Sequence, residues 1–170
     1  KFKDLTNDHP RMVIPFRDAD GKIFAYQGRA FGTEQPKYIT IVLDKDEKKI
    51  FGLDRVDHSR SILICEGPID SFFLPNCIAV AQGDLRLPQY KEKSTLVFDN
   101  EPRNREIIKN IEKAIEEGYS VVIWPQDIEE KDINDMIISG LTNVEISDII
   151  HRNTFSGLQA KTQLSHWKKI

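Results

Sequence analysis

The stretch ILICEGPIDSF, residues 62–72, contains an apolar run that ends on a carboxylate and a glycine. Four apolar residues in a row are typical of a strand that is buried on both faces of a sheet. Glu66 and Gly67 follow this run at once, and Asp70 comes four residues after Glu66. We therefore expect a buried strand to carry Glu66 to the edge of a sheet, where Gly67 allows a tight turn.

The chain beyond this stretch contains more apolar runs of the same kind. CIAVA (77–81), STLVFD (94–99) and YSVVIW (119–124) predict three further buried strands. Helical patterns lie between and after them, starting at Pro68, Asn104 and Asp132 and near residues 144–152 and 156–167. In the helix after Pro68, Phe72 and Phe73 are expected to face the sheet. Strands that alternate with helices indicate an α/β fold with a mostly parallel sheet flanked by helices.

Residues 1–60 have the pattern of strands and turns and lean basic. RMVIPF (11–16) and IFAYQGRAF (23–31) flank an Asp-Gly turn signal and predict a hairpin, and PKYITIVL (36–43) predicts another strand. KIFGLDRV (49–56) fits a strand or a short helix. This part holds 12 Lys+Arg against 10 Asp+Glu, whereas the rest holds 12 against 17. The asymmetry is mild and does not by itself name a partner.

Carboxylates follow every predicted strand of the α/β region. Because the carboxyl ends of parallel strands meet at one edge, we expect convergence there of Glu66, Asp84, Asp99, Glu101, Asp127 and Asp132. A single carboxylate at such a place is more often a helix N-cap or a solvated residue, and taken alone Asp70, Asp84 and Asp127 favour a structural role. Several unpaired carboxylates would repel one another, and divalent cations relieve this. Glu66 together with Asp99 and Glu101 therefore favours a site for Mg²⁺ or Mn²⁺, which prefer oxygen ligands.

Composition excludes several classes of protein. The 170 residues carry a net charge of -3, with 39% hydrophobic and 30% charged residues, as in ordinary globular proteins. No apolar run approaches ~18 residues, so we expect no membrane partner. The two cysteines and four histidines lack zinc-finger spacing, so no zinc is expected. The first residues do not resemble a signal peptide and include no methionine, so we expect a cytoplasmic fragment of a longer chain.

Three segments resemble the signatures of the TOPRIM domain. LICEGPID (63–70) resembles the glutamate-glycine turn with its later aspartate, and LVFDNEPRN (96–104) resembles the signature of two acids separated by one residue. Its second acid is Glu101 here, one methylene longer than the usual aspartate. KDINDMI (131–137) resembles the segment that closes the acidic cluster in primases of this class, with Asn134 where many relatives carry an acid.

Three segments within residues 1–60 make the resemblance more specific. RMVIPFRDADGKIFAYQGRAF (11–31), PKYITI (36–41) and KIFGLDRV (49–56) resemble, in order, the basic lobe that precedes TOPRIM in DnaG-like primases. The resemblance covers nearly the whole chain and is strongest to the DnaG-like primases of T4-like bacteriophages. It implies a small mixed α/β basic lobe at residues 1–60, a Rossmann-like TOPRIM domain at 61–140 and a C-terminal helical segment at 141–170.

The resemblance also implies an activity and its residues. The chain would be the RNA polymerase core of a DNA primase, which makes short RNA primers on single-stranded DNA from ribonucleoside triphosphates. The catalytic residues would be Glu66, Asp99 and Glu101. The ligands of two Mg²⁺ or Mn²⁺ ions would be Glu66, Asp70, Asp99, Glu101 and Asp132. Nucleotide or nucleic-acid binding would fall to Arg11, Arg29, Lys37, Tyr38 and Lys131. The arginine fork suits phosphate oxygens, although a solvated surface cation is the common alternative for each.

Partners follow from the resemblance alone. They are the single-stranded template, the triphosphates, the RNA primer and a replicative ring helicase, in the cytoplasm of a host cell. An upstream zinc-binding module, usual in this family, is not found in these residues.

Three other functions stay open. A TOPRIM nuclease would use the same acids to hydrolyse nucleic acid and would depend less on Arg29. A topoisomerase fragment would need a tyrosine nucleophile, and neither Tyr90 nor Tyr119 lies in a telling context. A non-catalytic nucleic-acid-binding module would be indifferent to Glu66→Gln, but the acidic chain disfavours it, because non-specific DNA binding depends on basic residues.

Overall fold

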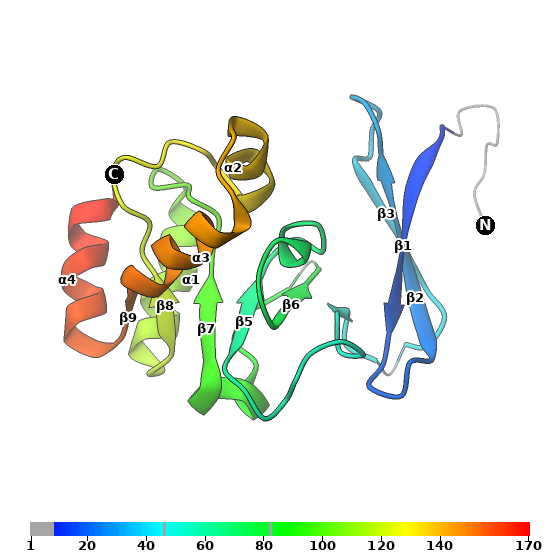
Figure 1. Ribbon diagram of the computed structural model, residues 1–170, viewed down its shortest axis with the longest axis horizontal. Helices are drawn as coiled ribbons and strands as arrows, with labels where there is room; N and C mark the ends of the chain where they lie inside the picture. The colour runs from blue at the N-terminus through cyan, green and yellow to red at the C-terminus, as the bar shows by residue number, and fades with distance from the viewer. Residues whose placement is uncertain (1–8, 46, 82) are drawn as a thin grey trace.

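The computed structural model describes residues 9–45, 47–81 and 83–170, which form two sheets and four α-helices (Figure 1). The N-terminal lobe is an antiparallel sheet in the order β1-β2-β3. Its strands are β1 (Arg11–Arg17), β2 (Ile23–Ala30) and β3 (Tyr38–Val42). The β1–β2 hairpin turns at Gly21, whose φ of 83° requires the left-handed region that glycine enters freely. The predicted hairpin and third strand are therefore confirmed.

The second sheet has six strands in the order β4-β6-β5-β7-β8-β9. These are β4 (Ile50–Phe51), β5 (Ile62–Cys65), β6 (Cys77–Val80), β7 (Ser94–Val97), β8 (Ser120–Val122) and β9 (Thr154–Phe155). The four inner strands are parallel, and the short edge strands β4 and β9 are antiparallel to them. The mostly parallel α/β sheet that the sequence predicts is confirmed.

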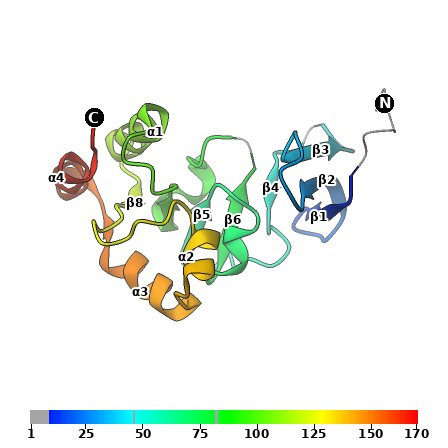
Figure 2. The ribbon, with the colours of Figure 1, turned by 90° about the horizontal axis from the view of Figure 1, so that it is seen from above.

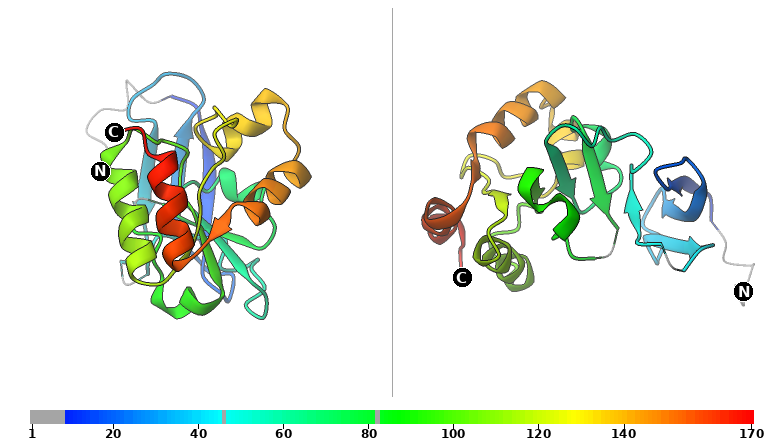
Figure 3. Two further views of the ribbon diagram at one scale, coloured as in Figure 1. Left: turned by 90° about the vertical axis from the view of Figure 1, so that its left-hand side faces the viewer. Right: turned by 90° about the horizontal axis from the view of Figure 1, so that it is seen from below.

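Helices cover both faces of this sheet (Figure 2). They are α1 (Arg105–Glu116), α2 (Ile133–Ser139), α3 (Asn143–Arg152) and α4 (Gly157–Trp167). Helices α1 and α4 pack side by side on one face, as Figure 3 shows, and α2 and α3 lie on the other. Isoleucines of α1 are buried against the sheet, and Gly118, at a φ of 84°, follows the end of that helix as predicted. No described helix is both long and apolar enough to cross a membrane.

The N-terminal lobe differs in one respect from the mixed α/β lobe that the resemblance implies. Within residues 9–45 and 47–60 it consists of strands and turns, without a helix. The ambiguous segment 49–56 supplies β4, which pairs with β6 of the larger sheet, and then turns. β-branched and aromatic residues dominate the described strands, and such residues pack well on a pleated surface. The larger sheet therefore draws a strand from residues 1–60, while the division at residues 60 and 140 stays a prediction.

The prediction of a helix after Pro68 is wrong. Only one 3₁₀ turn forms, Asp70–Phe72, and Phe72 is 57% exposed instead of facing the sheet. Pro75 explains this, because proline disfavours helical backbone in the residue before it and leaves too few residues for a stable α-helix. The neighbouring Phe73 does pack against the core.

Candidate functional site

The parallel pairing of β5 with β7 brings two acidic loops together. Cys65 and Val97, the last residues of these strands, lie side by side, so Glu66 and Asp99 leave the sheet at the same edge. The backbone N–H of Asp99 donates a hydrogen bond to Oε1 of Glu66 over 3.4 Å. A rigid, buried pair of strands therefore fixes where both carboxylates start.

Burial raises the pKa of three carboxyl groups at this edge. Loss of hydration is the largest cause each time, and it raises the pKa of Asp99 to about 7 and that of Asp70 to about 6. The charges of Glu66 and Asp70 raise the pKa of Asp99 further. Burial also raises the pKa of Glu66, followed by repulsion from Glu101, although the hydrogen bond from Asp99 opposes the shift. The negative charge of this edge is therefore poorly compensated by the chain itself.

Asp70 reaches the same edge from the 3₁₀ turn. Its Oδ1 accepts a hydrogen bond of 2.9 Å from the backbone N–H of Asn134, in the first turn of α2. Gly67 makes room for this carboxylate, because a Cβ at position 67 would lie 2.1 Å from Asp70 Oδ2. An alanine at position 67 would therefore force the Asp70 carboxylate to shift.

Lys131 is the cation of the acidic cluster. Its Nζ lies 3.7 Å from Asp99 Oδ2 and 3.6 Å from Glu101 Oε1, and half of its side chain is exposed. Burial alone would lower the pKa of Lys131, but the charges of Glu101 and Asp99 outweigh it, and the pKa is raised. One ammonium group between two acids leaves net negative charge among Glu66, Asp70, Asp99 and Glu101.

Asp132 has the capping role that its position suggested and also faces the site. It is the N-cap of α2, and its Oδ1 accepts a hydrogen bond of 2.8 Å from the N–H of Asp135. It also lines a pocket that it shares with Glu66, Asp70 and Asp99.

This pocket of about 210 Å³ separates the acidic edge from the N-terminal lobe. We call it the interlobe pocket; its polar wall residues are Gln27, Lys37, Tyr38, Glu66, Asp70, Asp99, Lys131 and Asp132. Lys37 Nζ lies 5.7 Å from the centroid of the Tyr38 ring. Desolvation raises the pKa of Tyr38, although the charge of Arg29 opposes the shift, so the phenol is neutral at pH 7. A basic and aromatic wall therefore faces a carboxylate wall.

A second, larger pocket of about 610 Å³ lies on the other side of the acids. Glu66, Asp99 and Lys131 line both pockets, and Glu101 lines the second. The acidic edge can thus be approached from two sides at once.

The other predicted residues lie outside the interlobe pocket. Arg11 donates to the carbonyl oxygen of Pro36 over 2.9 Å and so holds the loop that precedes β3. The Arg29 guanidinium lies 6.0 Å from the Tyr38 ring centroid, beside the pocket. Asp84 is hydrogen-bonded to Arg86, which lowers the pKa of Asp84. Asp127 is exposed and lines neither acidic pocket.

The carboxylates fit a divalent cation by their chemistry. Among residues 9–45, 47–81 and 83–170, no three Asp, Glu, His or Cys side chains are grouped closely enough to hold one ion between them. Mg²⁺ does not require such a cage, because it is usually held by one or two carboxylates, waters and substrate phosphate oxygens. Pairs such as Glu66 with Asp99 supply that number of ligands, and their pKa values are raised first by burial and then by neighbouring negative charge, which a cation would neutralise.

Asn100, which the sequence did not single out, holds the loop between the two acids of the second signature. Its Nδ2 donates to the carbonyl oxygens of Ile128 and Glu130, at 2.9 and 3.0 Å. Its Oδ1 accepts a hydrogen bond of 3.1 Å from Trp167 Nε1, and its backbone N–H donates to Lys131 O. Trp167 is thus buried at the end of α4. These partners are 28 to 67 residues away, so no local signal could reveal them.

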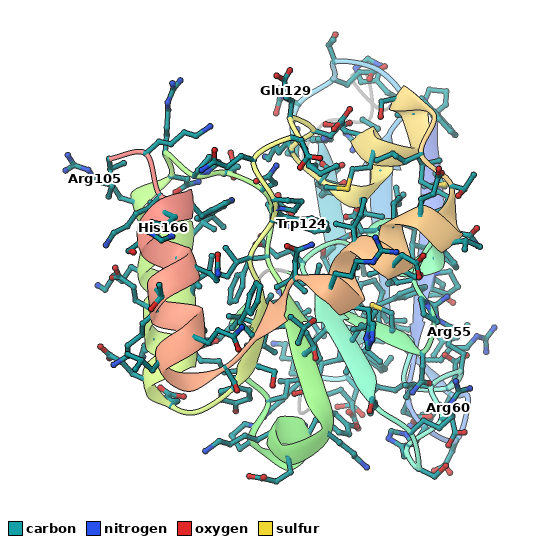
Figure 4. The ribbon with its side chains drawn as sticks, turned by 60° about the vertical axis from the view of Figure 1, so that its left-hand side comes forward. Arg55, Arg60, Arg105, Trp124, Glu129 and His166 are labelled. Atoms are coloured by element: carbon teal, nitrogen blue, oxygen red, sulfur yellow. The ribbon has the colours of Figure 1, made fainter. Side chains whose placement is uncertain are left out.

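Trp124 supports the same loop from the core (Figure 4). Its Nε1 donates a hydrogen bond of 2.8 Å to the carbonyl oxygen of Phe98, the residue before Asp99, and the side chain is buried. Trp124 therefore combines packing in the core with a polar contact at the end of β7.

We expect Asn100→Ala to lower the stability of the folded protein. It removes three part-buried side-chain hydrogen bonds, each with a net contribution of ~0.5–1.5 kcal/mol, so the free energy of unfolding should fall by about 2–4 kcal/mol. Urea unfolding measures this, with Gln126→Ala, on an exposed residue of the same region, as control. Equal unfolding midpoints for Asn100→Ala and the wild type would contradict the holding role of Asn100.

Comparison with known proteins agrees with this geometry. No family model matches the chain. The DNA primase of Enterobacteria phage T4 is 40% identical over 166 residues, which cover 95% of this chain and 48% of that primase. The chain therefore spans about half the length of this curated relative.

Solved structures agree at the level of the fold. The zinc-binding and RNA polymerase domains of the Aquifex aeolicus primase match with a TM-score of 0.66 and 21% identity, over 92% of this chain and 44% of that one. A DnaG primase catalytic domain bound to single-stranded DNA matches with a TM-score of 0.63 and 16% identity, over 85% and 52%. At such identities the likeness shows the fold alone. Along nearly its whole length the chain is therefore similar to a phage DNA primase, and its fold is that of DnaG primase catalytic cores.

Proposed function

We propose that the chain is the nucleotidyl-transfer core of a DNA primase, which synthesises short RNA primers on single-stranded DNA. The observation that carries the proposal is the interlobe pocket, in which the carboxylates of Glu66, Asp70 and Asp99 face Lys37 and Tyr38. An acidic wall suits divalent cations and a basic wall suits phosphates, and phosphoryl transfer needs both around one substrate. The relatives' activity supports the assignment.

In this proposal the acidic edge holds the metal ions. Glu66, Asp99 and Glu101 are the principal ligands of two Mg²⁺ or Mn²⁺ ions, and Asp70 and Asp132 are outer or occasional ligands. Bound divalent ions would stabilise negative charge on the attacking and leaving oxygens. Glu101 reaches the edge from the second pocket, so ligands would come from both sides of Asp99.

The transfer itself joins two nucleotides. The 3′-oxygen of the primer attacks the α-phosphorus of a ribonucleoside triphosphate, a new phosphodiester bond forms, and the bond to the bridging oxygen breaks, releasing pyrophosphate. The proton of the 3′-hydroxyl leaves to solvent or to Glu66, whose raised pKa makes its carboxylate a better acceptor than an exposed glutamate. We rank metal binding above base catalysis for Glu66.

The basic residues bind the anionic substrates. Lys37 and Lys131 line the pocket and would contact phosphate oxygens, while Tyr38 offers a ring on which a base can stack. Arg29 lies beside Tyr38 and would bind phosphate at the pocket entrance. Arg11 would act through the loop that it holds, in place of direct contact.

The wider assembly belongs to the proposal as well. The template would be single-stranded DNA, as in the related structure bound to single-stranded DNA, and the partner would be a replicative ring helicase. The work would take place in the cytoplasm of the host cell.

The test is primer synthesis on single-stranded DNA with labelled ribonucleotides and Mg²⁺ or Mn²⁺. Wild-type protein should make short RNA, and Glu66→Gln should reduce the yield by about 10²–10³-fold, the usual cost of removing one group that stabilises transition-state charge. Glu92→Gln, an exposed exchange at the opposite end of the strands, should leave the yield unchanged.

Two results would reject the proposal. Degradation of the template that depends on Glu66, without RNA, would establish a nuclease. Binding of DNA that is indifferent to Glu66→Gln, again without RNA in the presence of the helicase, would establish a non-catalytic module.

A further inference from the structure

One buried polar atom in the interlobe pocket has no partner. Gln27 is 3% exposed, yet its Oε1 makes no hydrogen bond within the described residues. Its Nε2 donates only a long hydrogen bond of 3.4 Å to Thr40 Oγ1 on the neighbouring strand. A buried carbonyl oxygen without a hydrogen-bond donor is destabilising, so such an atom in a pocket indicates a missing ligand.

The sheet of the N-terminal lobe directs this side chain to the acidic edge. In β2, Ala25, Gln27 and Arg29 alternate with residues of the opposite face, and Gln27 pairs with Thr40 while Arg29 pairs with Tyr38. Gln27 lines the same pocket as Tyr38 and as the carboxylates of Asp70 and Asp99. A substrate held against the acids would therefore present its other side to Gln27.

The chemistry of the amide restricts the group that it can bind. Oε1 requires a hydrogen-bond donor, and an ionised phosphate oxygen has none to offer. The remaining donors of a nucleotide are the base edges and the ribose hydroxyls. Base edges differ among the four nucleotides, whereas a primer copied from varied templates must accept all four. A ribose hydroxyl is common to every ribonucleotide, and it both donates and accepts, so it satisfies either orientation of the amide.

We propose that the side-chain amide of Gln27 binds the 2′-hydroxyl of the ribonucleotide in the interlobe pocket and so selects ribose over deoxyribose. This inference rests on the proposed function, since it assigns the substrate class of the same pocket. A deoxyribonucleotide would leave Oε1 buried and unpaired, and sites built around such a hydrogen bond reject the analogue that lacks it. The 2′-hydroxyl is also the group by which proteins distinguish RNA from DNA.

The first experiment measures binding, so that it does not depend on catalysis. Equilibrium dialysis with radiolabelled ATP and 2′-deoxy-ATP in Mg²⁺ gives the ratio of their dissociation constants. Wild-type protein should prefer ATP by about 10–100-fold, from the loss of ~1.4–3 kcal/mol with an unpaired buried group. Gln27→Met, which keeps the length of the side chain but has no amide, should bring the ratio close to one. Gln126→Met, on an exposed glutamine, should leave the ratio unchanged.

A second variant and a stability measurement separate loss of the ribose contact from loss of the fold. Gln27→Leu removes a polar atom that has no partner within the described part of the chain, so both Gln27 variants should melt at or above the wild-type temperature. Thr40→Val, which frees the amide from its neighbour, should reduce the preference only in part. Equal binding of ATP and 2′-deoxy-ATP by wild-type protein, or an unchanged preference in Gln27→Met, would overturn the inference.

Primer synthesis separates this inference from the proposed function. If wild-type protein prefers ATP in dialysis and Gln27→Met loses the preference, the ribose contact holds even where no RNA is made. If RNA is made with ribonucleotides and Gln27→Met keeps the full discrimination against 2′-deoxy-ATP in kcat/KM, the proposed function holds and the ribose contact is wrong.

Discussion

Replacing Asp99 with asparagine is expected to reduce RNA synthesis strongly and, at the same time, to stabilise the metal-free protein at pH 8. Asparagine has the size of aspartate but no charge, so it removes a proposed metal ligand while ending the repulsion from Glu66 and Asp70. RNA synthesis should fall by on the order of 10²–10³-fold. The stability gain follows from the raised pKa of Asp99.

The sign of this gain depends on pH. The folded state holds the proton of Asp99 up to a pKa of about 7, whereas the ordinary value is 3.8. Between these values the folded state binds more protons than the unfolded state, so the stability of the wild type falls as pH rises. The shift corresponds to roughly 4 kcal/mol at ~1.36 kcal/mol per pKa unit. Water screens a side chain that is 21% exposed, which reduces the gain to about 2–3 kcal/mol, or ~4–10 °C in Tm.

Calorimetry at pH 5 and pH 8 measures both parts of this expectation. In EDTA, Asp99→Asn should melt higher than the wild type at pH 8, and the difference should shrink at pH 5, where the wild-type carboxyl is protonated. Added Mg²⁺ should raise the Tm of the wild type more than that of the variant, because a ligand that binds only the folded state stabilises it. Asp127→Asn, on the exposed loop after β8, should change the Tm neither at pH 5 nor at pH 8. Equal Tm values for Asp99→Asn and wild type at pH 8 in EDTA would show that Asp99 is not destabilised by its surroundings.

The sequence alone was sufficient to predict the part of the site that the parallel strands position. A run of apolar residues predicts a strand, and parallel strands place the residues after their carboxyl ends at one edge. The neighbourhood of Glu66 and Asp99 could therefore be expected from residues 62–66 and 94–99 alone. Local chemistry was sufficient for Asp132 as well, since an aspartate before a helical pattern predicts an N-cap.

The features of the fold and the site that the sequence did not predict depend on contacts between distant segments. Pro75 prevents the helix that the residues after Pro68 suggested, and Phe72 is exposed as a result. The hydrogen bond from the Arg11 guanidinium to a loop 25 residues away could not be foreseen from the residues around Arg11. Gln27 looked like an ordinary strand residue, and only the pairing of β2 with β3 and the approach of the larger sheet reveal its unpaired oxygen. Tertiary contacts of this kind leave no periodic signal in a single sequence.

The exchange Gly67→Ala is expected to reduce RNA synthesis by about 100-fold while the protein stays folded. The new Cβ would lie 2.1 Å from Asp70 Oδ2, so the carboxylate must move. It cannot turn away freely, because its other oxygen accepts the hydrogen bond from the Asn134 N–H that joins the 3₁₀ turn to α2. A displacement of ~1 Å at a reacting centre is sufficient for a loss of that size.

A double-mutant cycle shows whether the effect passes through Asp70. Steady-state RNA synthesis would be measured for Gly67→Ala, Asp70→Ala and the double variant, with circular dichroism to verify the fold. If the methyl group acts by displacing Asp70, the double variant should be no worse than Asp70→Ala, because the displaced group is already gone. Losses that multiply in the double variant would mean that Gly67 acts separately, by allowing a substrate close to its own backbone. In that case Gly67 would belong to the substrate-binding surface. Losses that do not add would instead show that Gly67 acts by leaving room for the Asp70 carboxylate at the acidic edge.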